Sequence, residues 1–197
     1  MFRQATIPLL FVLSPALRSD PGVAALTRRL RKAALRREPI SLGTPAAPYE
    51  PLAGRREENP LRQILLREEG LEIALTTGTP RILRELDLLV ELDRRHSVAV
   101  RMVVPASSTD TELSMQAVRG LAAEGIATTL LLSPAAPGNR SGEETFRFLL
   151  EGALEAGALD VEIDAPSLRR GERFSLVGTF TRLRLEYGFP RGASGRG

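Results

Sequence analysis

Two short apolar runs of this chain each end in small polar residues of the kind that bind ligands. The first run, Ile40–Gly43, leads into Thr44 and then through a proline-rich loop to Tyr49 and Glu50. The second run, Leu71–Thr76, leads into Thr77-Gly78-Thr79-Pro80. Hydroxyl groups and backbone N–H groups at a helix start suit the polar groups of a ligand. The predicted binding residues are therefore Gly43, Thr44, Tyr49, Glu50, Thr76 and Thr77.

The same residues also have a purely structural interpretation. Threonine before a helix is a common capping residue, and capping is the favoured interpretation for the second loop. In the first loop, Tyr49 and Glu50 could contact a ligand's amino group or a partner. Alternatively, Pro48 and Pro51 stiffen a surface loop and Tyr49 covers the next helix. No catalytic residue is predicted.

The composition excludes several classes of site. The chain contains no cysteine, which rules out disulfides, zinc–cysteine sites and iron–sulfur clusters held by thiolates. His96 is the only histidine, and its place in Arg94-Arg95-His96-Ser97 predicts a solvated residue at a helix end. No metal site is expected. The net charge is only +3, which is weak support for a nucleic-acid partner.

The apolar periodicity predicts alternating strands and helices. Apolar runs typical of strands occur at Ile7–Leu13, Ile40–Gly43, Leu71–Thr76, Val98–Val104, Thr128–Leu132 and Leu159–Ile163. Amphipathic stretches typical of helices occur at Pro21–Arg37, Glu57–Glu69, Pro80–Arg95, Thr111–Glu124, Gly142–Ala156 and Glu172–Tyr187. Strands that are apolar on both faces and alternate with helices indicate an α/β fold with a parallel sheet. Six such units fit a (βα)6 partial, open TIM-like barrel with its helices outside, or a doubly wound sheet.

The remaining features concern the chain ends and the charged surface. We expect one domain over residues 1–190 and a flexible Gly-rich tail over residues 191–197. The first apolar run is too short to span a bilayer, so we expect a cytoplasmic protein without a membrane contact. The basic run Arg28–Lys32 lies on a predicted helix with Leu26, Leu30 and Leu35 at core spacing. It is interpreted as a solvated helix face, with nucleic-acid contact as the alternative.

Three segments, in this order along the chain, resemble the radical S-adenosylmethionine (SAM) superfamily, in the branch related to spore photoproduct lyase. They are PISLGTPAAPYEPL, LEIALTTGTPRILRELDLL and AVRGLAAEGIATTLLLSPAAPGN. The resemblance covers roughly residues 8–164 and implies a (βα)6 partial barrel. It also implies that Gly43 and Thr44 face the amino-acid end of SAM, and that Thr76 and Thr77 face its ribose or carboxylate.

The departures from this family concern its chemistry. Members hold a 4Fe–4S cluster with a Cys-x3-Cys-x2-Cys loop, and this chain has no cysteine. Polar positions before the Pro-Tyr turn are Ala46 and Ala47 here, and a Lys-Ser pair is replaced by Thr77-Gly78. We therefore expect no 4Fe–4S cluster and, at most, weak SAM binding.

These observations favour a non-catalytic binding or scaffold protein that has lost the cluster site. An open barrel leaves strand edges uncovered, so a protein partner or homo-oligomer is expected. The alternative is an enzyme: either a radical SAM fragment or subunit whose cluster loop is missing from this chain, or a cluster-free enzyme that uses the same strand ends.

Overall fold

The computed structural model describes residues 5–7, 20–36, 38–45, 48–49, 68–105, 111–133, 143–163 and 170–189. This part of the chain is an α/β fold whose parallel strands are hydrogen-bonded in chain order, from β1 to β6. Its contacts divide the chain into two compact units, residues 1–100 and 101–197. The expectation of one domain over residues 1–190 stays a prediction. The tail 191–197 and most of the predicted helix 57–69 lie outside the described residues.

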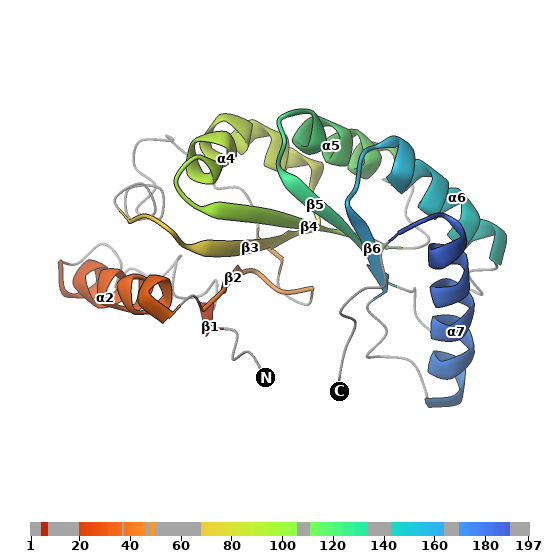
Figure 1. The fold of residues 1–197 in the computed structure, drawn as a ribbon, viewed down its shortest axis with the longest axis horizontal. Helices are drawn as coiled ribbons and strands as arrows, with labels where there is room; N and C mark the ends of the chain where they lie inside the picture. The colour runs from red at the N-terminus through yellow and green to blue at the C-terminus, as the bar shows by residue number, and fades with distance from the viewer. Residues whose placement is uncertain are drawn as a thin grey trace. The chain divides into compact units, whose positions relative to one another are not determined.

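The first unit contains three strands that pair in parallel and in chain order. Ile40 pairs with Ala5 on one side and with Ile73 on the other, and Leu42 pairs with Ile7 and Leu75. A helix follows the first strand, and a 3-10 turn followed by an α-helix follows the third (Figure 1). The elements are β1 (Ala5–Ile7), α2 (Asp20–Arg36), β2 (Ile40–Leu42), β3 (Glu72–Thr77), η3 (Pro80–Glu85), α4 (Leu86–Asp93) and the start of β4 (Ser97–Pro105).

Apolar side chains of strands and helices form the core of this unit. Ile40 and Leu71 on the strand side are buried, as are Leu30 of α2, Ile82 of η3 and Leu89 of α4. Leu30 and Ala33 are buried one turn apart, so this face of α2 packs inward. The packing predicted from the apolar periodicity is therefore confirmed for these residues, but it is wrong for Leu35 of α2, which is exposed.

The second unit continues the alternation of strands and helices. Its elements are the end of β4, α5 (Thr111–Ala123), β5 (Ala127–Ser133), α6 (Glu143–Glu155), β6 (Asp160–Ile163) and α7 (Arg170–Glu186). β5 and β6 pair in parallel from Thr129–Asp160 to Leu132–Ile163. Three consecutive residues of β4, 102–104, are buried. Burial of adjacent residues means that both faces of the strand are covered, as the apolar runs predicted.

Helix α7 is held to its unit by one aromatic contact and two sets of ion pairs. The rings of Phe146 on α6 and Phe180 on α7 meet edge to face with centroids 5.6 Å apart. The Arg184 guanidinium donates to the carboxylate of Asp160 on β6, its Nε lying 2.9 Å from Oδ1. At the surface, Glu143 of α6 accepts from Arg182 of α7 and from Arg147. The hydrogen bond from Arg147 lowers the pKa of Glu143 below its usual range.

Two boundaries differ from the sequence-based expectations. The first strand is β1, at Ala5–Ile7, and of the predicted run Ile7–Leu13 only Ile7 is among the described residues. The predicted helix Pro80–Arg95 begins as the 3-10 turn η3, in which the Ile82 amide bonds to the Thr79 carbonyl at 3.2 Å. Among the described residues, no helix has the length and apolar content needed to cross a membrane.

Candidate functional site

The predicted site residues lie at the carboxyl ends of β2 and β3, which are neighbouring parallel strands. Gly43 directly follows β2 and has a φ of 79°, a conformation that favours glycine. A Cβ atom at this position would lie 2.5 Å from the Thr76 carbonyl oxygen and 2.6 Å from the Tyr49 amide nitrogen. Only glycine leaves room for the loop backbone to approach β3 at this point.

The backbone of Tyr49 is hydrogen-bonded to the end of β3 through both its N–H and its carbonyl group. The Tyr49 amide donates to the Thr76 carbonyl oxygen at 2.6 Å. The Thr77 hydroxyl donates to the Tyr49 carbonyl oxygen at 2.8 Å. The proline-rich loop therefore returns to the sheet and places its aromatic residue against the strand that follows it in sequence.

The side chain of Tyr49 is part of the core. It is only 3% exposed, and its hydroxyl donates to Oε2 of Glu85 at 2.8 Å. Glu85 is the last residue of η3 and is itself only 8% exposed. A buried carboxylate needs hydrogen-bond donors, and the tyrosine hydroxyl is one of them.

The threonines at the end of β3 and in the turn after it fix the local backbone. Besides donating to Tyr49, the Thr77 hydroxyl accepts from the Thr79 amide at 3.3 Å. The Thr79 hydroxyl accepts from the Arg81 amide at 3.3 Å, so Thr79 caps η3 as predicted. Thr76 and Thr77 are both buried, whereas Thr44 is half-buried. The structure thus brings together Gly43, Tyr49, Thr76 and Thr77, and Glu50 lies outside the described residues.

Glu85 is the member of this cluster that sequence reasoning missed. Ile82, Glu85 and Leu89 are spaced three and four residues apart, and all three are buried. The sequence signal was therefore a carboxylate at a core-facing position of an apolar stripe. Such a residue requires a polar partner, but periodicity alone does not say that the partner is Tyr49, 36 residues earlier.

The prediction for His96 is wrong, because this residue is buried and not solvated. His96 lies between the end of α4 and the first residue of β4, next to Leu71, which directly precedes β3. The Leu71 amide donates to Nδ1 of His96 at 3.2 Å, and the Ser97 amide donates to the Leu71 carbonyl oxygen at 2.8 Å. The ring thus accepts a hydrogen bond from the backbone N–H of Leu71, which is buried and needs an acceptor within the protein.

The described residues offer no conventional metal or cluster site. They contain no group of three or more His, Cys, Asp or Glu side chains that could hold a metal ion. In the same residues, every buried side-chain nitrogen or oxygen has a hydrogen-bond partner. A 4Fe–4S cluster does not fit this chain, because the whole sequence supplies no thiolate.

Comparison with models of protein families gives no match, and neither does comparison with curated proteins. Sequence and structure together therefore establish an α/β fold with a parallel sheet in a chain without cysteine.

Proposed function

We propose that this chain is a radical-SAM-like partial barrel that has lost its cluster site and acts as a non-catalytic binding or scaffold protein. One observation carries the proposal. At the strand ends where parallel α/β folds bind their ligands, Tyr49 is hydrogen-bonded to two other predicted site residues, Thr76 and Thr77, and its hydroxyl is bound to Glu85.

The strand order supports the barrel-like part of the proposal. Within each unit the strands follow chain order without reversal. A doubly wound sheet reverses its strand order at the point where its ligand binds. Right-handed connections between strands in chain order place their helices on one face, which is the arrangement in a barrel.

Two of the predicted binding side chains are already hydrogen-bonded within the protein. The Tyr49 hydroxyl is bound to Glu85, and the Thr77 hydroxyl bridges the Tyr49 carbonyl and the Thr79 amide. A ligand that used these groups would have to break buried hydrogen bonds, and each such group left unpaired costs about 1–3 kcal/mol. This opposes tight binding of a polar ligand such as SAM through these side chains.

Anaerobic reconstitution with iron and sulfide tests the loss of the cluster. We expect no stable chromophore, because iron–sulfur clusters in proteins are held mainly by cysteine thiolates. A radical SAM enzyme with its three cysteines, treated in parallel, is the positive control. Stoichiometric iron and sulfide, with the broad visible absorption of a 4Fe–4S centre, would instead support an enzyme or an enzyme subunit.

A further inference from the structure

The outward face of α2 is basic and carries one exposed leucine. Arg28, Arg31, Lys32 and Leu35 are spaced three, four and seven residues along the helix, so they lie on one face. All four are exposed, while Leu30 and Ala33 are buried on the other side. Leu35 is 87% exposed, the highest value among the large apolar residues of the described chain.

Among the described residues, one of these three cations, Arg31, forms an ion pair. Arg31 donates from Nε to both carboxylate oxygens of the buried Glu68, at 3.1 and 3.2 Å. Within the described residues, Arg28 and Lys32 form no ion pair. This basic face, defined by residues 28, 31, 32 and 35, is therefore able to receive anionic groups.

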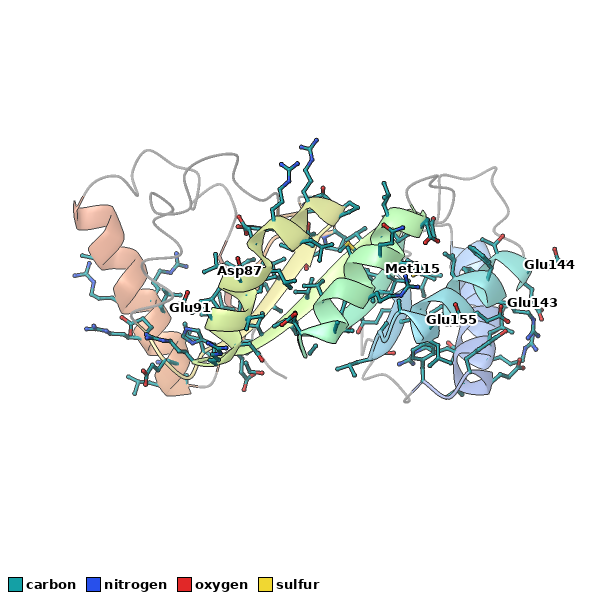
Figure 2. The ribbon with its side chains drawn as sticks, turned by 90° about the horizontal axis from the view of Figure 1, so that it is seen from above. Asp87, Glu91, Met115, Glu143, Glu144 and Glu155 are labelled. Atoms are coloured by element: carbon teal, nitrogen blue, oxygen red, sulfur yellow. The ribbon has the colours of Figure 1, made fainter. Side chains whose placement is uncertain are left out.

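The outward face of α6 has the opposite charge and also carries one exposed aromatic residue. Glu144, Phe148, Glu151 and Glu155 are spaced four, seven and eleven residues along the helix and are all exposed. Phe146, Leu149, Leu150 and Ala153 are buried on the inner side. In Figure 2, the labelled Glu144 lies near the start of α6 and Glu155 near its end.

The acidic face, defined by residues 144, 148, 151 and 155, also has carboxylates that are not in ion pairs within the described residues. Glu144 and Glu155 form no ion pair within the part of the chain that the structure describes. Glu151 accepts one hydrogen bond, from the Tyr187 hydroxyl at 2.6 Å. Phe148 is 65% exposed between these carboxylates.

We propose that the basic face of α2 binds the acidic face of α6 in a second copy of this chain. This inference rests on the proposed scaffold function and names its partner. In an antiparallel helix pair, placing Leu35 against Phe148 sets Arg31 and Lys32 opposite Glu151. The same register sets Arg28 opposite Glu155, because both lie seven residues from the apolar contact.

The contact joins two different surfaces, so it is heterologous. After the first contact, one copy keeps a free acidic face and the other keeps a free basic face, so assembly continues into rings or open chains. A single helix pair buries less than about 1,200 Å², which is the range of weak interfaces. Self-association is therefore concentration-dependent and weakens as salt screens the charges.

Sedimentation velocity of the full chain over a range of concentrations, at low and high salt, tests this proposal. The basic-face variant is Arg28→Glu with Lys32→Glu, and the acidic-face variant is Glu151→Arg with Glu155→Arg. Arg81→Glu with Arg119→Glu is the control for the first variant, because it makes the same change in net charge at two other exposed positions. Glu69→Arg with Glu124→Arg serves the acidic-face variant in the same way. Circular dichroism verifies that all four variants are folded.

We expect wild type and both controls to form larger species as concentration rises and to dissociate at high salt. Each face variant alone should associate at least about tenfold more weakly, because like charges then meet. A mixture of the two face variants should associate again, because the reversed faces are complementary to each other.

Wild type that stays monomeric at low salt would overturn the proposal, as would face variants that behave like the controls or a mixture that does not associate. Monomeric wild type that binds an RNA or DNA fragment through the basic face would also overturn it, in favour of a nucleic-acid contact. These failures leave the non-catalytic function standing, since that is decided by cluster reconstitution and by SAM titration.

Discussion

Replacing Gly43 by alanine should destabilise the protein far more than the same change at Gly70. Both glycines have positive φ, 79° at Gly43 and 71° at Gly70, so both substitutions carry a backbone penalty of about 1–2 kcal/mol. At Gly70 the new methyl group meets no atom within 4 Å. At Gly43 it would lie 2.5 Å from the Thr76 carbonyl oxygen and 2.6 Å from the Tyr49 amide nitrogen.

The added penalty at Gly43 follows from the contacts that must give way. Moving the loop breaks the bond between the Tyr49 amide and the Thr76 carbonyl and weakens the bond from Thr77 to Tyr49. Buried groups left unpaired cost about 1–3 kcal/mol each. We therefore expect Gly43→Ala to lower the free energy of unfolding by at least about 2 kcal/mol more than Gly70→Ala.

Urea unfolding followed by far-ultraviolet circular dichroism measures this difference. The two variants and wild type should share one dependence on urea concentration and differ in their midpoints. If Gly43→Ala and Gly70→Ala agree within about 0.5 kcal/mol, a value typical of neutral surface changes, then the loop does not rest on β3 as described.

Two further changes test the buried polar contacts. Tyr49→Phe removes the hydroxyl that donates to Glu85 and should cost about 1.5–3 kcal/mol of stability, the value for hydrogen bonds to charged groups. The same substitution in a Glu85→Leu background should cost clearly less. Equal losses in both backgrounds would show that the pair is not coupled. Arg184→Leu leaves the carboxylate of Asp160 without its buried partner and should cost about 3–5 kcal/mol of stability. Arg182 is exposed, so Arg182→Leu should cost at most about 1 kcal/mol in the same unfolding assay. Similar losses for the two variants would contradict the burial of the Arg184 pair.

Local features of the fold could be predicted because they depend on residues close in sequence. The apolar runs predicted the boundaries of β2 to β6 to within one residue, and Thr79-Pro80 marked the start of η3. Gly125 and Gly157 both have positive φ where α5 and α6 give way to the next strand, which is the position at which glycine commonly ends a helix.

The contacts at the candidate site could be predicted only in part. Parallel strands bring their carboxyl ends together, which correctly grouped Gly43 with Thr76 and Thr77. The partner of the Tyr49 hydroxyl is 36 residues away on η3, and no local pattern specifies such a contact. The prediction for His96 was wrong for a related reason, since the backbone amide that its ring accepts from belongs to Leu71, 25 positions earlier.

Calorimetric titration of SAM into the purified protein tests the central claim most directly. The claim is that the polar groups at the ends of β2 and β3 hold the fold together and are not kept for a ligand. We expect no binding, or a Kd no tighter than roughly 0.1 mM. The chain lacks the cluster and several polar residues that radical SAM proteins use to bind SAM, and each 1.4 kcal/mol of lost binding free energy weakens affinity about tenfold. Binding in the low micromolar range would contradict the account and would indicate a protein that senses or uses SAM without a cluster.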